Sequence, residues 1–481
     1  MGESGDGRPD AEQLNREQLI GLVRKLERLV DAQRTELERL RQENERLRRE
    51  GHRQAAPFSR RRRKPDPQRP GRKPGRGRFT QRAAPLADQV TQWVAVAPPG
   101  SCPCGGALEL VHYEDASTTD LWAAARPAVT VYRVPVCRCR RCGKTVRGRH
   151  PDLAGDQFGA TAHRVGDRAM AAAHALHYGI GVPQQQVPRI LRELCGLVVT
   201  PSALSQDAMR RAARDLATEY RALRASVAAR GVAHTDDTGW RVAGAPAQLM
   251  VFATPEGESV YQIRPQHRNE EVREVLPADY AGTMVTDRGR SYDARAFAAV
   301  RQQKCLAHVH RSIDAVLEQK VGAARVLGER LKGALKQGQE LWRSHHQGRV
   351  SARRFRAAAQ RIQAKITDLL RPRRMRDPDN DRLVHELGGH DDRGNLTRFL
   401  HDPAVPPTNN LAERELRPAV KARKVSQCSK TWRGARAREC HLSITRTTER
   451  TQPGSLIEAL HRTYRHARRR AARRTARGPS P

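Results

Sequence analysis

Aromatic residues are scarce in this sequence, and acidic residues are outnumbered. Phe, Trp and Tyr make up only 4% of the 481 residues, which argues against nucleic-acid binding dominated by base stacking on aromatic side chains. The 52 Asp and Glu face 89 Lys and Arg, so the formal net charge is +37. Lys and Arg gain affinity for phosphates by displacing counterions, so this charge predicts a polyanionic partner. Together the two features favour the backbone of double-stranded DNA.

Long hydrophobic runs are also missing. No stretch reaches the ~18 consecutive apolar residues that a transmembrane helix needs, which excludes a membrane span. The first residues, MGESGDGRPDAEQ, lack the basic and then apolar pattern of a secretory signal. We therefore expect a cytoplasmic protein that associates with the nucleoid. At roughly 100–200 residues per domain, the length predicts about three or four domains.

Cysteine is infrequent, with nine residues in the chain. An odd number in a cytoplasmic protein argues against a disulfide framework and favours a metal site. Two pairs stand in short knuckles, Cys102-Pro-Cys104 and Cys139-Arg-Arg-Cys142. Such knuckles resemble a zinc ribbon, in which four thiolates hold a structural Zn2+. We expect this domain over residues 83–152, with Cys137 as an alternative ligand; free thiols on turns are the other interpretation.

Residues 14–50 have the spacing of a leucine zipper. Seven of nine positions in an unbroken 4-3 pattern are apolar, and Asn44 is one of the two exceptions. Val at a and Leu at d favour a parallel two-stranded coiled coil, and a buried Asn fixes its register. We expect a homodimer; the alternative is one amphipathic helix packed on its own domain. The nine positions are Leu19, Val23, Leu26, Val30, Gln33, Leu37, Leu40, Asn44 and Leu47.

A basic arm rich in Pro and Gly follows at residues 51–82. Ten of the nineteen residues from Arg60 to Arg78 are Arg or Lys. Pro and Gly prevent a packed element here, so we expect an extended arm on DNA phosphates; Arg76-Gly77-Arg78 resembles an AT-hook core. A solvated linker is the alternative. The predicted DNA-binding residues are Arg60, Arg61, Arg62, Arg63, Lys64, Arg72, Lys73, Arg76 and Arg78.

Residues 153–230 are predicted to be a helical DNA-binding domain. A helix near 187–194, a break at Gly196, and a second helix with Thr200 as N-cap and Pro201 at N1 form a helix-turn-helix pattern. Such a pair either reads bases or serves as a plain packing unit.

From residue 232 the hydrophobic period becomes that of strands, and Asp236 and Asp287 are predicted to stand at strand ends. Residues 312–370 predict two antiparallel helices, and the polar segment 372–382 predicts a loop. Asn410 is the expected N-cap of a later helix that carries Glu413 in its first turn. The arginine-rich segment 451–481 predicts a basic helix or a frayed tail.

Asp236, Asp287 and Glu413 are the candidate catalytic residues. Three carboxylates suit a pair of Mg2+ or Mn2+ ions, which activate the attacking oxygen and stabilise the leaving oxygen at a phosphodiester. Each residue also has an ordinary interpretation. Asp236 and Asp237 end a strand, Asp287 starts a turn, and Glu413 completes a capping box.

Four sequence motifs carry a family resemblance. HTDDTGWRV, GTMVTDRGRSYDA, QKCLAHVHR and PPTNNLAERELRPAVKARKVS, in this order after the zipper, arm and knuckles, closely resemble transposases of the insertion sequence 66 family. The resemblance covers about residues 15 to 465, and the last motif is its most specific part. The family belongs to the DDE transposases, whose RNase H-like core holds a sheet flanked by helices.

The resemblance implies a multidomain α+β protein with a catalytic core at 231–311 and 396–450, a helical insertion at 312–395, and a basic tail at 451–481. It implies that Asp236, Asp287 and Glu413 are the three acids, supported by Asp237 and His308. The implied activity is binding of terminal inverted repeats, Mg2+-dependent strand cleavage and strand transfer by a 3'-hydroxyl, with companion proteins from the same element.

This chain departs from the family pattern after Asp287, where Arg288-Gly289 replaces the common Gly-Tyr. The Arg288 guanidinium either binds substrate phosphate or competes for Asp287, and in the second case this copy is inactive. A noncatalytic zinc-ribbon and coiled-coil DNA-binding regulator is the alternative function. The carboxylates discriminate between the two.

Overall fold

A computed structural model describes residues 15–52, 86–89, 127–138, 140–142, 145–147, 150, 153, 157, 164–372 and 374–476. The chain divides into two units, 1–119 and 120–481. The predicted DNA-binding residues of the basic arm lie outside the described residues, as do Cys102, Cys104 and Cys139.

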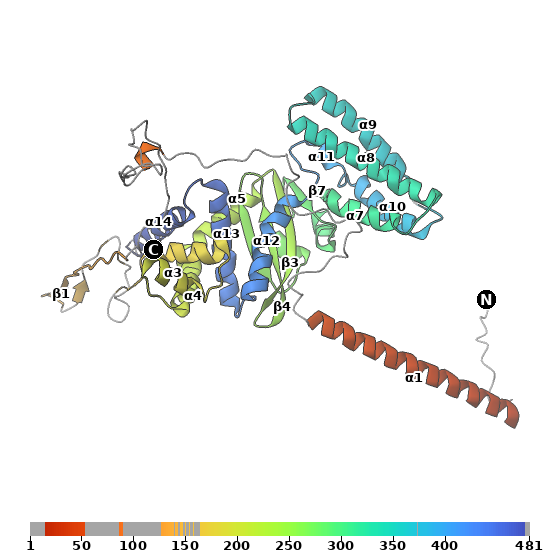
Figure 1. The fold of residues 1–481 in the computed structure, drawn as a ribbon, viewed down its shortest axis with the longest axis horizontal. Helices are drawn as coiled ribbons and strands as arrows, with labels where there is room; N and C mark the ends of the chain where they lie inside the picture. Colours follow the sequence, from red (N-terminus) through yellow and green to blue (C-terminus); the bar gives the residue numbers. More distant parts are fainter. Residues whose placement is uncertain are drawn as a thin grey trace, which may run out of the picture. The chain divides into compact units, whose positions relative to one another are not determined.

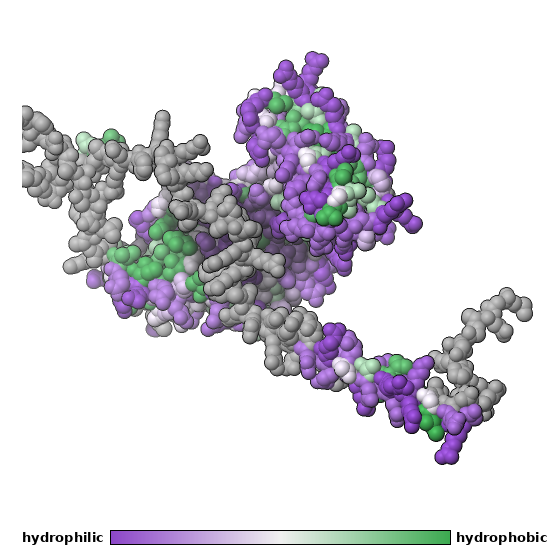
Figure 2. Space-filling model, turned by 45° about the vertical axis from the view of Figure 1, so that its right-hand side comes forward, coloured by the Kyte–Doolittle hydropathy of each residue, from purple (hydrophilic) through white to green (hydrophobic). Residues whose placement is uncertain are grey.

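The first unit contains the helix α1 (Arg16–His52) and a short 3-10 turn, η2 (Ala87–Gln89). Figure 2 shows apolar patches along α1, which is otherwise hydrophilic. The predicted a and d side chains that the structure describes are exposed; Leu37, for example, is 54% exposed. A single helix leaves this stripe in water, which is the arrangement from which a coiled coil gains stability by pairing. Dimerisation through α1 stays a prediction.

The second unit begins with a small antiparallel hairpin. Strand β1 (Val136–Arg138) pairs with β2 (Thr145–Arg147), and Arg138 stands opposite Thr145. Cys137 lies on β1, Cys142 lies in the turn that follows, and both are exposed. The hairpin therefore holds the described part of the second cysteine knuckle.

A helical segment follows, with α2 (Asp167–His174) continuing into the π-helix η4 (Ala175–Ile180), then α3 (Val187–Cys195), α4 (Pro201–Arg210), the π-helix η5 (Arg211–Asp215) and α5 (Ala217–Ala228). The predicted break and cap are confirmed. Gly196 ends α3 with φ 63°, and the Thr200 hydroxyl accepts from the Ala203 N–H at 3.2 Å. Pro201 occupies the first turn of α4, where its missing N–H costs nothing. Base recognition by α4 stays a prediction.

Five strands form one mixed sheet in the order β5-β4-β3-β6-β7 (Figure 1). Strands β3 (Val232–Val242), β4 (Ala245–Ala253) and β5 (Ser259–Arg264) are antiparallel neighbours, whereas β6 (Thr283–Thr286) and β7 (Arg301–Lys304) run parallel to β3. The connection from β5 to β6 contains α6 (Asn269–Arg273), and that from β6 to β7 contains the 3-10 turns η6 (Arg290–Tyr292) and η7 (Arg295–Phe297).

Both faces of the sheet are buried, and alternate residues of β4 belong to different cores. Met250 and Phe252 pack with Val227 of α5 on one face. Leu249 and Val251 pack on the other face, against α12 (Asn410–Ser426) and α13 (Trp432–Thr451). A strand with both faces covered has a nearly continuous run of apolar residues. This is why the segment LMVFA predicts a strand although its apolar and polar residues do not alternate.

Helix α13 also closes the outer edge of the sheet. Side chains at every fourth position, Glu439, Ser443 and Thr447, accept hydrogen bonds from the backbone N–H groups of Ile263, Tyr261 and Ser259 at 2.7, 2.8 and 3.0 Å. The helical repeat of four residues thus matches alternate positions of β5. These bonds satisfy backbone donors that an uncovered edge strand would present to other chains.

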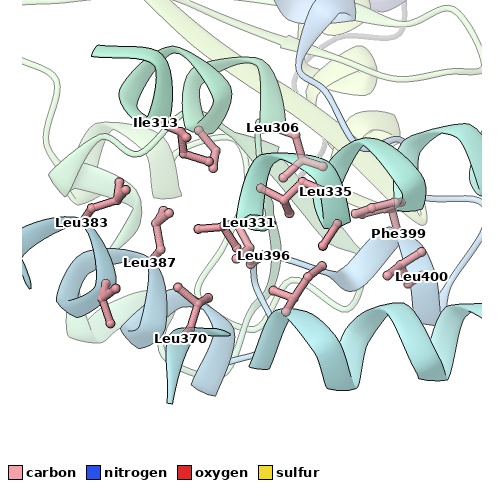
Figure 3. Close-up of a cluster of buried hydrophobic side chains, with 14 of the residues drawn as sticks. Leu306, Ile313, Leu331, Leu335, Leu370, Leu383, Leu387, Leu396, Phe399 and Leu400 are labelled. Atoms are coloured by element: carbon pink, nitrogen blue, oxygen red, sulfur yellow. The ribbon is translucent and has the colours of Figure 1, made fainter. Parts of the chain in front are cut away.

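Five helices form one cluster, called here the helical insertion, which begins before and ends after the predicted bounds 312–395: α7 (Leu306–Leu317), α8 (Ala323–His346), α9 (Ala352–Leu370), α10 (Pro378–Asp392) and α11 (Arg398–His401). Figure 3 shows its apolar core, in which Leu331 and Leu335 of α8 meet Leu387 of α10 and Phe399 of α11. The prediction of two helices over 312–370 is wrong in part, because the first expected helix is divided into α7, which ends at Leu317, and α8, which begins at Ala323. Helices α8 and α9 pack against each other. The predicted loop at 372–382 is wrong in part, because α10 begins inside it, capped by Asp377.

The last helix, α14 (Leu456–Ala476), resolves the two alternatives for the basic C-terminal segment in favour of a helix. Its apolar side chains Leu460 and Tyr464 are buried against α2 and α13. No described helix is both long and apolar enough to cross a membrane.

Candidate active site

Asp236 and Asp287 come from neighbouring parallel strands. Strand β3 pairs with β6 through Val232–Thr283, Ala233–Met284 and His234–Val285. Two positions beyond the last of these pairs, the same register places Asp236 beside Asp287. Because residues two positions apart on a strand share a face, the two aspartates lie on the same face as His234 and Val285. Asp287 directly follows β6, as predicted. The prediction that Asp236 ends its strand is wrong, because β3 continues to Val242 as the hairpin partner of β4.

A tight turn holds the Asp287 carboxylate. The Gly289 N–H donates to Asp287 Oδ1 at 2.8 Å. A Cβ at position 289 would lie 2.9 Å from the same oxygen, so glycine leaves room for this contact. The turn interpretation of Asp287 is thus correct, but it engages one carboxylate oxygen with a single N–H. A metal role and the turn are therefore compatible at this residue.

Glu413 lies in the first turn of α12, and its position is not explained by helix capping. The N-cap is Asn409 rather than the predicted Asn410, and its side chain makes no capping hydrogen bond. The capping box proposed for Glu413 is therefore absent. Glu413 Oε1 is buried and has no hydrogen-bond partner among the described residues. A buried carboxylate oxygen without a donor is costly unless a ligand or cation satisfies it.

Asn409 connects the start of α12 to the two other segments that carry the site. Its side-chain amide donates to the Thr235 carbonyl oxygen at 2.8 Å, and its backbone N–H donates to Cys305 Sγ at 3.1 Å. The Cys305 N–H in turn donates to the Thr286 carbonyl oxygen at 2.8 Å. Thr235 and Thr286 immediately precede Asp236 and Asp287. One fully buried asparagine therefore links the backbone beside all three acids.

The charges of the acids act on one another. Burial raises the pKa of Asp236 to about 7; a hydrogen bond from the Asp237 N–H opposes this shift, and the negative charges of Asp287, Asp237 and Glu413 add to it. A carboxylate with a raised pKa among like charges is stabilised in its ionised form by a bound cation. The electrostatics of the site thus favour divalent metal binding.

Asp237, the predicted supporting residue, faces a different partner. His267 Nδ1 lies 3.0 Å from Asp237 Oδ1, and the His267 ring meets Tyr292 edge to face. The Tyr292 hydroxyl lies 3.3 Å from the Thr235 hydroxyl. These contacts form a partly buried polar layer on the face of β3 that carries Thr235 and Asp237. Sequence reasoning missed His267, which no motif marks.

His308 stands on α7 directly beside Glu413. Its Nδ1 lies 4.0 Å from Glu413 Oε1, and this nitrogen is buried without a hydrogen-bond partner in the described chain. Burial lowers the pKa of His308, as does the charge of Arg311, whereas the charges of Asp287 and Glu413 raise it. Ligand atoms of Cys305, His308 and Glu413 all lie within 4.8 Å of one another. His308 is therefore close enough to support the third acid.

Arg288 does not pair with Asp287. Its guanidinium donates to Glu386 Oε1 at 2.8 Å and to the Ser312 hydroxyl. Both partners belong to the helical insertion, on α10 and α7. The side chain that was expected either to compete for Asp287 or to bind phosphate is held by these two residues.

A ridge of four cations runs along α12 from the candidate site. Its members, called here the α12 ridge, are Arg414, Arg417, Lys421 and Lys424, and all four are exposed. Spacings of three, four and three residues place them on one helix face. The opposite face carries the buried Leu416 and Ala419. A line of positive charge that begins next to Glu413 matches the repeating charge of a phosphodiester backbone.

A separate groove lies elsewhere in the described structure, and the three acids do not line it. It has a volume of about 1160 Å3 and is bordered by Tyr220, Ile263 and Trp432 among others. Its two carboxylates, Glu274 and Glu439, are both paired with Arg264. This groove therefore lacks a free acid or base for phosphodiester chemistry.

Comparison with known protein families gives a match to the region of the chain that carries the candidate site. Residues 163–437, more than half of the chain, match the family described as "Transposase IS66 family". The matched region contains the whole five-stranded sheet and all three candidate acids. None of the curated proteins compared with the sequence matches it.

Proposed function

Because the chain belongs to the IS66 family of transposases, we propose that it is a DNA transposase of the DDE type with an RNase H-like core. Asp236, Asp287 and Glu413 are its three catalytic acids. The single observation that carries this assignment is the Asn409 linkage, which ties the backbone next to each acid into one place. A sheet flanked by helices is the fold that the family resemblance implies, and the five-stranded sheet with its covering helices is compatible with it.

Two Mg2+ or Mn2+ ions fit this donor set. Carboxylate oxygens are the ligands that these hard cations prefer, and Glu413 Oε1 is a buried oxygen that lacks a partner within the described chain. When bound, such ions lower the pKa of water and stabilise the charge on phosphate oxygens. Asp236, Asp287 and Glu413 would hold these ions, while the Asp287 turn and Asn409 fix the positions of the three carboxylates. Asp237 and His308 support the neighbouring acids.

The reaction is cleavage at the ends of an insertion sequence, followed by strand transfer. In the first step water attacks a terminal phosphodiester and frees a 3'-hydroxyl. In the second step that hydroxyl attacks a phosphodiester of target DNA, which forms a new phosphodiester and releases a 3'-hydroxyl of the target strand. The protein positions both DNA strands, and the α12 ridge neutralises the phosphates on one side of the acids.

The N-terminal regions supply DNA binding and pairing in this proposal. The basic arm contacts phosphates, and the helices at 164–230 hold the terminal inverted repeats together with the zinc ribbon. Cys102, Cys104, Cys139 and Cys142 bind one structural Zn2+, which predicts about one zinc per chain after purification. The α1 zipper pairs two protomers so that both element ends are held together, and companion proteins of the same element join this complex.

A cleavage assay with duplexes that carry the element ends tests the proposal. Inverted repeats in the DNA that flanks the gene identify these ends. We expect Mg2+-dependent nicking and joined products from the wild type, and at least about a 100-fold loss for Asp287→Asn and Glu413→Gln. Glu340→Gln, at an exposed acid of α8, is the matched control and retains activity.

The outcome also separates the alternatives. Specific binding of the duplex without any cleavage by the wild type indicates a noncatalytic regulator. Cleavage without joined products indicates a nuclease that lacks strand transfer. Cleavage that survives both acid substitutions overturns the catalytic assignment.

A further inference from the structure

A second set of metal ligands meets at the candidate active site, and it differs in chemistry from the three acids. Cys305, His308 and Glu413 each offer one ligand atom, and the three atoms lie within 4.8 Å of one another. Cys305 precedes α7, His308 lies in the first turn of α7, and Glu413 lies in the first turn of α12. Only Glu413 belongs to both sets.

Two of the three ligand atoms make no hydrogen bond in the described structure, although the Arg311 guanidinium lies 4.0 Å from one of them, Glu413 Oε1. His308 Nδ1 and Glu413 Oε1 are both buried without a hydrogen-bond partner, and they face each other at 4.0 Å. That separation is too long for a hydrogen bond. In a tetrahedral zinc site, metal–ligand distances of about 2.0–2.3 Å place ligand atoms about 3.3–3.8 Å apart. Small side-chain adjustments therefore bring these two atoms to the separation that a tetrahedral zinc site requires.

The same helix provides a contrast. His310, two residues further along α7, has its Nε2 at 2.9 Å from Gln339 Oε1. Neither ring nitrogen of His308 has a hydrogen bond to a described residue, whereas on His310 only the buried Nδ1 lacks one. The third ligand atom is already oriented, because Cys305 Sγ accepts the N–H of Asn409 at 3.1 Å. Hydrogen bonds of this kind orient a metal-bound thiolate and stabilise its charge.

The ligand types decide which ion binds. A thiolate and an imidazole favour Zn2+ and similar borderline ions over Mg2+, whose preferred ligands are oxygens. We propose that Cys305, His308 and Glu413 form a regulatory zinc site, with water in the fourth position. Binding releases the thiol proton of Cys305 to solvent and leaves the thiolate on the metal. This inference rests on the proposed function, in which Glu413 is the third catalytic acid.

Zinc bound in this way inhibits strand cleavage. The Glu413 oxygen that binds the zinc is no longer available to Mg2+, and the zinc adds positive charge beside the Mg2+ ligands, so the two metals compete for this carboxylate. Removal of zinc restores the carboxylate to the Mg2+ site, so the inhibition is reversible. The site thus makes transposition sensitive to free zinc.

Cobalt binding to the full-length protein tests the site without an activity measurement. Co2+ replaces Zn2+ at thiolate sites and gives a sulfur-to-cobalt charge-transfer absorption. Because the cysteine knuckles also contribute, the measurement is the difference between the wild type and Cys305→Ser. We expect loss of one thiolate–cobalt component in Cys305→Ser and loss of the same component in His308→Gln. Cys440→Ser and His310→Gln are matched controls and retain it.

Zinc inhibition of Mg2+-dependent cleavage is the second test, with each variant normalised to its own rate without added zinc. We expect Cys305→Ser to need about 10- to 100-fold more zinc for half inhibition than the wild type. Equal inhibition of both proteins, or identical cobalt spectra, overturns the zinc site while the proposed function stands. If the wild type does not cleave DNA at all, the proposed function fails, and the cobalt spectra alone decide whether the site exists.

Discussion

The side-chain amide of Asn409 donates to the carbonyl oxygen of Thr235 at 2.8 Å, although the two residues are 174 positions apart in the chain. Asn409 Oδ1 accepts from His234 Nδ1 at 3.1 Å, so both ends of the amide are used by β3. Burial lowers the pKa of His234 to about 4, and its ring is therefore neutral at physiological pH. A neutral ring with its proton on Nδ1 is the tautomer that this bond requires.

Asn409→Ala is predicted to impair metal binding as well as stability. The variant leaves the Thr235 carbonyl and the His234 ring without partners, which costs about 1–3 kcal/mol of unfolding free energy. It also frees the start of α12, so we expect the Mg2+ concentration for half-maximal cleavage to rise about tenfold or more. The measurements are thermal unfolding and a Mg2+ titration of cleavage.

Asn380→Ala is the matched control for this prediction. Asn380 is 2% exposed and also donates from its amide to a carbonyl oxygen, that of Ala324, at 2.8 Å. It lies in the helical insertion, so its loss should lower stability by a similar amount without changing the Mg2+ requirement. Equal Mg2+ requirements for the two variants would show that Asn409 is only structural.

Arg288→Ala is predicted to keep strand cleavage within about tenfold of the wild type. The guanidinium is bound by Glu386 and Ser312, and the Glu386 side chain is 47% exposed. Because exposed ion pairs contribute little, we expect the free energy of unfolding to fall by only about 1 kcal/mol. Glu386→Gln should have a similar small effect, because it breaks the same pair. Cleavage rates and thermal midpoints check both variants. If Arg288→Ala reduces the salt dependence of DNA binding by about one unit, Arg288 contacts a phosphate after all.

Much of the core of this fold is predictable from local sequence, but the strand β7 is not. Its sequence, RQQK, has no apolar residue. Gln302, Gln303 and Lys304 are nevertheless buried, and the amide of each glutamine has a specific partner. Gln302 donates to the Tyr292 carbonyl oxygen, and Gln303 accepts from the Phe399 N–H at 3.0 Å. Such pairing depends on segments far apart in the chain, so no periodic pattern reveals it.

The candidate site is likewise predictable from the sequence only in part. Asp236, Asp287 and Glu413 could be proposed from motifs, because carboxylates in those positions suit divalent metals. The role of Asn409 could not, since capping rules assign an asparagine before a helix to the helix itself. Here its side chain bonds to a strand instead, and the N-cap is one residue earlier than predicted. Local rules fail at this residue because a tertiary contact outcompetes the cap.

The α12 ridge is predicted to contact DNA phosphates. Arg417→Ala combined with Lys421→Ala removes two exposed cations from one face of α12. We expect weaker duplex binding, and a slope of the logarithm of the binding constant against the logarithm of salt concentration that is smaller by about 2. Filter binding or fluorescence anisotropy at several salt concentrations measures this slope.

The matched control takes two cations with the same spacing from the insertion. Arg361→Ala with Lys365→Ala removes two exposed charges from α9. It lowers the net charge equally, so a general charge effect would change both variants alike. A salt slope that changes equally in the two double variants would contradict a specific role for the α12 ridge.

The buried histidines between the helical segment and α13 are predicted to make the protein acid-sensitive. Burial lowers the pKa of His177 and of His441 to about 4, against about 6.5 in an unfolded chain. The folded state therefore binds fewer protons than the unfolded state between these values. The contribution of each neutral histidine to the free energy of unfolding is fully present above pH ~6.5. It is lost as the pH falls towards 4, by an amount on the order of 2–3 kcal/mol for each histidine. The thermal midpoint at pH 7.5 and at pH 5 measures this loss.

His441→Gln tests the assignment of that acid sensitivity. The glutamine amide retains a donor for the Ala208 carbonyl oxygen, which His441 Nε2 approaches at 3.0 Å, but it cannot take up a proton. We expect the variant to lose less stability than the wild type between pH 7.5 and pH 5. His466→Gln, at an exposed position of α14, should leave the pH dependence unchanged. An identical loss in His441→Gln and the wild type would place the acid-sensitive groups elsewhere, because a residue that cannot be protonated cannot contribute to the linkage.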